Sequence, residues 1–238
     1  GSDYNCSCNF KNNEDKLFLG NVSNHYCRKY DYINFAGANP IVKPNVKTAK
    51  DKFTLHFWFF AHSYVDNIFK GLRVEWVDQL TIEVNLDSTN KYNFVCNVNG
   101  VTTNLIEIKM DTWNFLHCAA DYPEKIIYFT TEEDSFSINF DTTQPSVGTS
   151  TSLKISDLTE DNKKTWGILF YKYIRIWSDA FQYSSFLSRI KIDTCYFDSY
   201  LLQQWNTVIN KDHIVKETRG DTNDDIEVSY NDNKKGTN

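Results

Sequence analysis

Residues 92–106 read Tyr92-Asn93-Phe94-Val95-Cys96-Asn97-Val98-Asn99-Gly100-Val101-Thr102-Thr103-Asn104-Leu105-Ile106. Apolar residues alternate with polar ones ahead of Asn99-Gly100, as in a strand that buries one face, and a second short β pattern follows the pair. An Asn-Gly pair between two strands is the signature of a two-residue type I′ hairpin, because both turn residues need positive φ. This stretch therefore predicts an antiparallel hairpin.

Further short β patterns, separated by polar turns, extend from this hairpin in both directions along the chain. They lie at residues 53–60, 71–77, 80–86, 113–120, 125–130, 135–140, 152–155 and 167–177. About a dozen strands at roughly ten-residue spacing are typical of an all-β sandwich or jelly roll. One helix is expected late in the chain, where Ser199 would cap a segment with one apolar face at helical spacing, formed by Leu201, Leu202, Trp205 and Ile209.

The composition supports a β protein. Aromatic residues make up 16% of the 238 residues, whereas Ala, the best helix former, occurs only 7 times. Asn occurs 25 times, against 9 Gly and 4 Pro. We therefore expect Asn and Asp to make most of the turns, since both tolerate left-handed backbone.

Polarity along the chain divides it into three parts. Residues 1–29 form a polar, Cys-rich N-terminal arm, residues 30–215 the sandwich with its helical extension, and residues 216–238 a polar tail or linker. The sandwich itself should span about residues 30–192. No stretch approaches the ~20 apolar residues of a membrane span. The net charge of −6 argues against a nucleic acid partner.

Six cysteines lie at positions that fit no zinc motif: Cys6, Cys8, Cys27, Cys96, Cys118 and Cys195. An even number, with three in the first 27 residues, suits disulfides in an oxidising compartment. Two glycosylation sequons, at Asn5 and Asn21, agree with that setting. The sequence therefore predicts an extracellular or cell-surface location.

Three blocks of the chain resemble, in order, strands of one known superfamily. They are residues 53–59, residues 112–121 with the hairpin partner at 125–129, and residues 167–181, which contain Arg175-Ile176-Trp177. The blocks are similar to the laminin G-like, concanavalin A-like jelly-roll superfamily. The resemblance implies an antiparallel jelly-roll β-sandwich of the laminin G type.

The resemblance also implies a disulfide arrangement. Because such sandwiches place their first and last strands side by side, Cys195 is expected to reach one cysteine of the N-terminal arm. The second bridge would then join Cys27 to Cys6 or Cys8.

For Cys96 and Cys118 the sequence allows two arrangements. Both face the core by strand alternation. In a simple meander their strands are second neighbours, ~9.5 Å apart, which is too far for a disulfide. If the intervening strand changes sheets, the two strands become adjacent and the cysteines can bond, which is the arrangement that we favour.

Catalytic and metal-binding patterns give few candidates. Glycosidases on this kind of fold use paired carboxylates on one strand face, and no such run is present. We expect no catalytic residue and no cofactor, with calcium as the one metal to consider. Its candidate ligands are the loop carboxylates of Asp66, Asp87 and Asp157.

These observations predict a non-enzymatic extracellular recognition or adhesion module of a larger surface or secreted protein with flanking domains. It would bind a protein or glycan partner through loops on one rim of the sandwich. An exposed aromatic patch drawn from Trp58, Trp76, Tyr183 and Trp205 would suit such binding. The alternatives are a carbohydrate-active enzyme, its accessory carbohydrate-binding domain, or a structural spacer.

Overall fold

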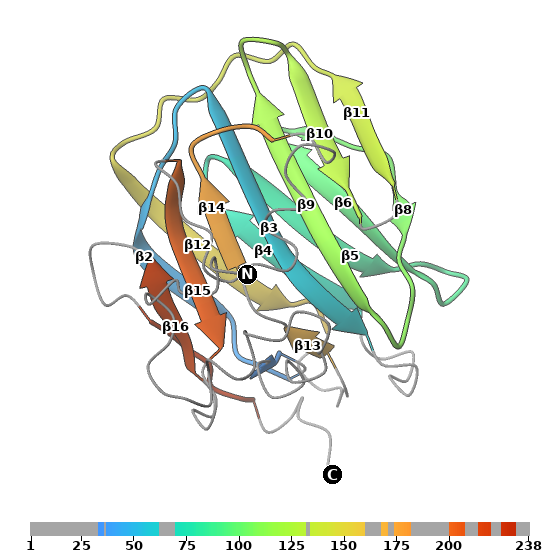
Figure 1. The fold of residues 1–238 in the computed structure, drawn as a ribbon. Helices are drawn as coiled ribbons and strands as arrows, with labels where there is room; N and C mark the ends of the chain where they lie inside the picture. The colour runs from blue at the N-terminus through green and yellow to red at the C-terminus, as the bar shows by residue number, and fades with distance from the viewer. Residues whose placement is uncertain are drawn as a thin grey trace, which may run out of the picture.

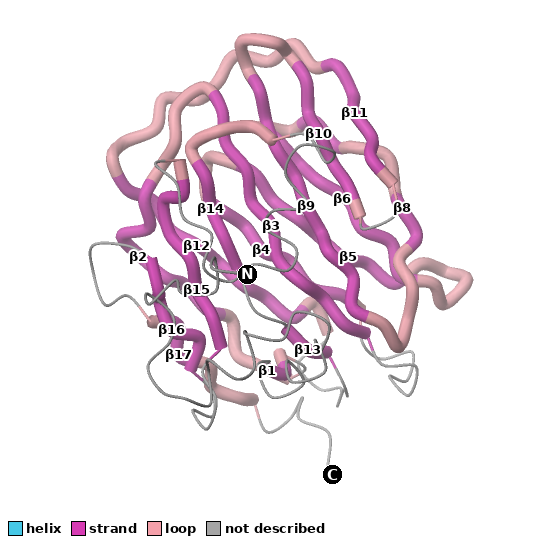
Figure 2. Tube along the Cα trace, in the orientation of Figure 1, coloured by secondary structure: helices cyan, strands magenta, loops and turns pink. Residues whose placement is uncertain are grey.

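Two antiparallel β-sheets pack face to face in the computed structural model (Figure 1). The structure describes residues 33–35, 37–61, 70–131, 134–159, 168–170, 174–181, 200–207, 214–219 and 225–231. These residues form strands and connecting loops, with no helix among them (Figure 2). Accordingly, no helix in this part of the chain is long and apolar enough to cross a membrane.

The larger sheet has ten strands and is built around β3. Its main order is β11 (Ser135–Asn139), β10 (Ile126–Thr130), β9 (Trp113–Asp121), β3 (Lys52–Ala61), β14 (Ile174–Trp177), β15 (Leu201–Thr207), β16 (Ile214–Arg219) and β17 (Ile226–Glu227). Beside β14, the strand β13 (Ile168–Phe170) also pairs with β3 and with β1 (Ile33–Asn34).

The smaller sheet has seven strands. Its order is β2 (Ile41–Lys47), β12 (Ser150–Asp157), β4 (Gly71–Trp76), β5 (Leu80–Leu86), β6 (Tyr92–Val98) and β7 (Val101–Thr102), and β8 (Ile106–Glu107) also pairs with β6. The chain therefore alternates between the sheets, because β4 to β8 lie in one sheet and β9 to β11 in the other.

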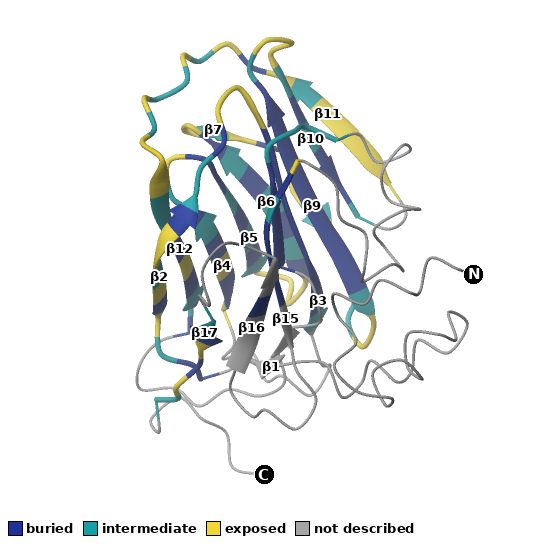
Figure 3. Ribbon diagram, turned by 60° about the vertical axis from the view of Figure 1, so that its left-hand side comes forward, coloured by how far each residue is buried: buried dark blue, intermediate teal, exposed yellow. Residues whose placement is uncertain are grey.

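The hydrophobic core lies between the sheets, where each strand contributes every second residue. On β3 these residues are Phe53, Leu55, Phe57 and Phe59, all fully buried. Figure 3 shows β9 buried along nearly its whole length, whereas β11 at the sheet edge is mostly exposed. The central strands therefore anchor the sandwich and the edge strands face solvent.

The predicted hairpin is confirmed. Asn99 and Gly100 have φ angles of 47° and 81°, and Val98 pairs with Val101 across the turn. Among the described non-glycine residues with positive φ, all except Lys125 are Asn or Asp. Asn and Asp thus make the left-handed turns that the composition predicted.

The helix predicted after Ser199 is wrong, because Leu201–Thr207 form β15. The pairing of β15 with β14 shifts register between Gln203 and Leu201, and Leu202 packs against the core that contains Trp205. Trp205 pairs with Ile174 of β14 and packs in the core. Pairing with two neighbouring strands therefore overrides the helical pattern.

The sheet also extends past residue 216, where the sequence predicted a polar tail. That boundary falls inside β16, and Ile226 and Val228 are buried in the core. The backbone of Ala38 forms a β-bridge with Tyr230. Residues 37–39 therefore lie beside residues 229–231.

Candidate functional site

The outer face of the larger sheet carries a buried layer of aromatic and polar side chains. It comprises Thr54, His56, Trp58, Phe115, His117, Arg175 and Trp177, which we call the outer layer. These residues alternate with the core residues on β3, β9 and β14, and His56 pairs in register with both His117 and Arg175. All seven are at most 5% exposed. The predicted strand 53–60 is thus buried on both of its faces.

Ring contacts and hydrogen bonds centred on His56 connect the outer layer. The His56 ring lies 5.0 Å from the ring of Phe115 and 6.2 Å from those of His117 and Trp177. The indole Nε1 of Trp177 donates to His56 Nε2 at 2.9 Å. Because Nε2 is the acceptor, the neutral imidazole has its proton on Nδ1.

Burial keeps both histidines of the outer layer uncharged. It lowers the pKa of His117 to about 3. Burial also lowers the pKa of His56, with further contributions from the nearby charge of Arg175 and from His117. The Arg175 guanidinium donates from Nε to Gln204 Oε1. The outer layer is therefore a packed polar layer and not a surface open to ligands.

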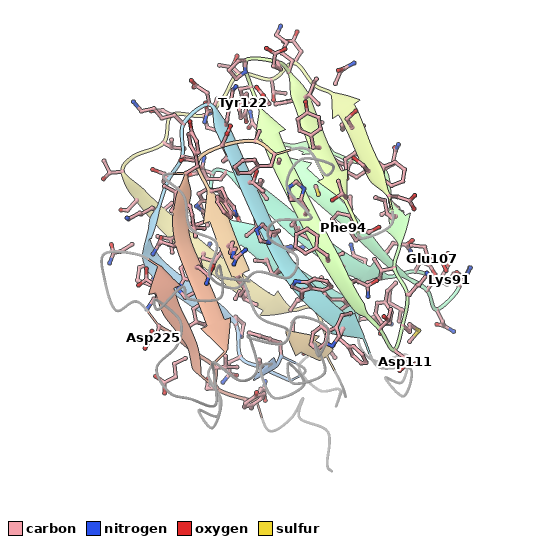
Figure 4. The ribbon with its side chains drawn as sticks, in the orientation of Figure 1. Lys91, Phe94, Glu107, Asp111, Tyr122 and Asp225 are labelled. Carbon is pink, nitrogen blue, oxygen red and sulfur yellow. The ribbon has the colours of Figure 1, made fainter. Side chains whose placement is uncertain are left out.

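A small cavity opens to solvent at the rim next to the outer layer. Its volume is about 130 Å³, and we call it the rim pocket. Its lining comes from β8, the loop to β9, the start of β9 and the β10–β11 turn, namely Ile106, Glu107, Lys109, Thr112, Trp113, Asn114, Thr131 and Asp134. In Figure 4, Glu107, Lys91 and Asp111 lie near this rim, and Tyr122 lies at the opposite end of the sandwich.

Asn114 shapes the wall of the rim pocket by holding the loop before β9. Its Nδ2 donates to the carbonyls of Lys109 at 2.9 Å and Thr112 at 3.1 Å, and its Oδ1 accepts from the Lys109 amide at 3.3 Å. Asp111 supplies the left-handed residue of this loop, with φ of 57°. The loop is therefore preorganised by its own side chains.

Trp113 places a half-buried indole in the rim pocket, with its ring centroid 5.2 Å from that of Phe60. The exposed carboxylates of Glu107 and Asp134 line the same cavity. Glu107 forms an ion pair with Lys91 at 3.3 Å. An apolar ring beside acceptor oxygens suits a sugar, which has C–H groups on its ring faces and hydroxyls around its edge.

The calcium candidates do not form a metal site in the described part of the chain. Asp87 caps its own turn, where its carboxylate accepts hydrogen bonds from the Thr89 hydroxyl and amide, the Lys91 amide and the Asn93 side chain. The Thr89 hydroxyl bond, followed by the Lys91 amide bond, lowers the pKa of Asp87. These bonds use the oxygens that a cation would need.

The carboxylate of Asp157 also accepts hydrogen bonds from the protein itself. It is buried and accepts from the amides of Gly37 and Thr159, each at 2.8 Å. Asp66 lies outside the described residues. Within the described ranges no group of three His, Cys, Asp or Glu residues is placed to hold a metal. Calcium binding by these carboxylates therefore stays a prediction.

Three of the four aromatic residues considered for an exposed patch are buried, so they do not form one. Trp58 is 5% exposed, and Trp76 and Trp205 are fully buried. Tyr183 lies outside the described residues, as do Asn5, Asn21 and the cysteines Cys6, Cys8, Cys27 and Cys195. The sequence interpretation missed Trp113 as a surface aromatic, although the polar Asp111-Thr112 turn before it marks the rim end of a strand.

Comparisons with known proteins identify the fold. No family model and no curated protein matches the chain. Among solved structures, the full extracellular region of zebrafish Gpr126/Adgrg6 matches with a TM-score of 0.50 at 15% identity, covering 76% of this chain and 26% of that one. The chain has the concanavalin A-like, laminin G-like jelly-roll fold. The resemblance predicted from the three sequence blocks is confirmed at the level of the fold.

Two further solved structures match at lower TM-scores. A heptameric SAP-like pentraxin from Limulus polyphemus has a TM-score of 0.43 at 13% identity, covering 63% of this chain and 77% of that one. A toad ovary galectin, solved with thio-digalactose, has a TM-score of 0.31 at 12% identity, covering 54% and 96%. These likenesses concern architecture alone, so the function must be argued from the rim pocket itself.

Proposed function

We propose that this jelly roll is a non-enzymatic recognition module that binds a glycan at the rim pocket. The observation that supports this most directly is the half-buried indole of Trp113 beside the acceptor oxygens of Glu107 and Asp134 in one cavity. Trp combines a large apolar surface with a polar edge, which favours it at binding sites. The ring of Phe60 supports the indole from the adjacent strand, so little ordering is needed on binding.

The size of the rim pocket favours one sugar residue as the occupant. Its volume of about 130 Å³ is well below that of sites for drug-sized ligands. Hydroxyls would donate to Glu107 and Asp134, and Thr112 and Thr131 would offer further hydrogen bonds. We therefore expect a terminal or branch sugar to enter the cavity while the rest of the glycan lies along the rim.

We further propose an extracellular location, within a longer protein. The even number of cysteines supports an oxidising compartment. The likeness to an extracellular region, of which this chain spans 26%, agrees with both points. In that setting glycans on other surfaces are the available partners.

A glycan array probed with the purified chain tests the proposal. Trp113→Ala should lower affinity for the bound glycan roughly tenfold or more, because it removes the stacking surface. Tyr200→Ala, which truncates an aromatic residue 49% exposed on the other side of β3, is the matched control and should bind normally. Equal binding by the Trp113 variant would refute the rim pocket as the site.

The same array tests the cofactor expectation. Because Asp87 and Asp157 already accept hydrogen bonds from the chain, we expect binding to be equal with calcium and with EDTA. Loss of binding in EDTA would show a calcium site among residues that the structure does not describe.

A carbohydrate-active enzyme is the second candidate, and one observation favours it. Two carboxylates, those of Glu107 and Asp134, line a single pocket, as glycoside hydrolysis requires. The Glu107 side chain is exposed and forms an ion pair with Lys91 at 3.3 Å, whereas catalysis of this kind favours carboxylates in a site that excludes water. Release of reducing sugar from a polysaccharide panel, abolished in Asp134→Asn, would establish the enzyme.

A further inference from the structure

We propose that Cys96 and Cys118 form a disulfide that joins the two sheets through the core. Cys96 lies in the middle of β6 in the smaller sheet, and Cys118 lies in β9 of the larger sheet. Both side chains are fully buried and belong to the core between the sheets. This inference is independent of the proposed glycan site.

Neither arrangement considered from the sequence is the one observed. The two strands are not second neighbours in one sheet, and they do not pair with each other. They face each other instead, and Cα atoms of β6 and β9 come within 8 Å. Both cysteines are free thiols in this structure, and Cys118 is near enough to contribute to the raised pKa of Cys96. A disulfide between facing strands of a sandwich is the arrangement used by immunoglobulin domains.

Neighbouring strands hold both cysteines in place. The Cys96 amide donates to Thr103 Oγ1 at 3.0 Å, and its carbonyl accepts from the Thr103 amide at 2.9 Å. Cys118 lies between Leu55 of β3 and Phe129 of β10. Each backbone is thus held within its own sheet, with the two side chains directed into the same core.

Bond formation needs an oxidant, for which we name a low-molecular-weight disulfide such as oxidised glutathione. The thiolate of one cysteine attacks that disulfide and releases one thiol, giving a mixed disulfide. The second cysteine thiolate then attacks the sulfur of the first cysteine in this mixed disulfide, which forms the Cys96–Cys118 bond and releases the second thiol. The protein loses two protons and two electrons, and the oxidant becomes two thiols.

The burial of the pair indicates when this reaction occurs. Burial, together with the contact to Cys118, raises the pKa of the Cys96 thiol and disfavours the attacking thiolate in the folded protein. We therefore expect the bond to form while the chain folds. Protein that has already folded in the reduced state should resist both oxidation and alkylation.

The disulfide would also link the two walls of the rim pocket. β6 pairs with β8, which contributes Ile106 and Glu107, and β9 begins with Trp113. A covalent bond between β6 and β9 would therefore limit separation of the sheets beside the pocket. This coupling is a consequence of the bond and not a condition for it.

Peptide mass spectrometry tests the bond on the full chain. The protein is refolded in a glutathione redox buffer, alkylated in denaturant without reduction, and digested with trypsin. Cleavage after Lys91, Lys109 and Lys125 places Cys96 and Cys118 on separate peptides, residues 92–109 and 110–125. We expect these two peptides to be joined and lighter than their summed masses by about 2 Da.

Alkylation of both Cys96 and Cys118, or a bond from either one to another cysteine, would overturn the proposal. Cys96→Ala serves as the control, because Cys118 should then be alkylated. Thermal unfolding gives a second readout. The oxidised chain should melt roughly 5–10 °C above a Cys96→Ala/Cys118→Ala variant refolded in the same redox buffer, in which the other four cysteines are unchanged.

Discussion

At the scale of single residues, three glycines differ sharply in what they allow. Gly71 has a φ of 143°, and a Cβ there would lie 1.9 Å from the carbonyl oxygen of Val84 in the neighbouring strand. Gly100 has a φ of 81° in the hairpin but open space around it. Gly148 has ordinary backbone, and a Cβ there would lie 3.9 Å from its nearest neighbouring atom. An added Cβ would therefore meet both a steric clash and an unfavourable φ at Gly71, an unfavourable φ alone at Gly100, and neither at Gly148.

Alanine at these three glycines should therefore give a graded loss of stability. We expect Gly71→Ala to lower the free energy of unfolding by about 3 kcal/mol or more, since strand β5 must move. Gly100→Ala should cost about 1 kcal/mol, from left-handed backbone alone. Gly148→Ala should be within about 0.5 kcal/mol of the parent. Urea unfolding measures all three, and equal values for Gly71 and Gly148 would contradict the close approach of β4 and β5.

At the scale of elements, the outer layer on β3, β9 and β14 makes stability depend on pH. In the unfolded chain a histidine has its ordinary pKa of about 6.5, whereas burial holds the pKa of His117 in the folded protein at about 3. Below pH 6.5 the unfolded chain therefore binds a proton that the folded chain does not. The neutral, buried His117 therefore contributes fully to the free energy of unfolding above pH 6.5, and this contribution is lost as the pH falls.

We expect the free energy of unfolding to decrease steadily as the solution is acidified from neutral pH. At pH 5, His117 alone should account for a loss of about 2 kcal/mol, and His56 shifts in the same direction. His117→Phe, which keeps an aromatic ring next to Phe115, should show a shallower pH dependence than the parent. Identical pH profiles for the two proteins would mean that His117 is not buried in its neutral form.

At the scale of the whole molecule, Gln203 ties the two sheets together through hydrogen bonds. This buried side chain of β15 accepts from the amide of Lys47 in β2 at 2.7 Å. Its Nε2 donates to Glu217 of β16 at 2.8 Å. One amide thus connects the smaller sheet with two neighbouring strands of the larger sheet.

Gln203→Ala should accordingly destabilise the sandwich by about 3 kcal/mol, because two buried hydrogen bonds are lost together. Gln144→Ala is the matched control, since that half-buried side chain makes one solvent-exposed bond, to the Lys50 carbonyl, and should cost less than about 1 kcal/mol. Chemical denaturation of the two variants provides the comparison. A Gln203 variant as stable as the control would show that packing alone holds the sheets together at this point.

Local features of the sequence were sufficient to predict most strands and the hairpin. The alternation in residues 80–86 and 92–98 became β5 and β6 with the same bounds, and Asn99-Gly100 formed the expected turn. These features depend on side-chain direction and turn geometry within a few residues, so they can be read without knowing the neighbours. The three motif blocks likewise identified the jelly roll.

Tertiary pairing decided the features that the sequence left open or predicted wrongly. Leu201–Thr207 became a strand because β14 and β16 were there to pair with it, and β9 joined the sheet opposite β6, which brought Cys118 to Cys96. The rim pocket likewise forms only where β8 of one sheet meets the start of β9 in the other. Sheet partners far apart in sequence determine which aromatic residues are buried, and no local pattern contains that information.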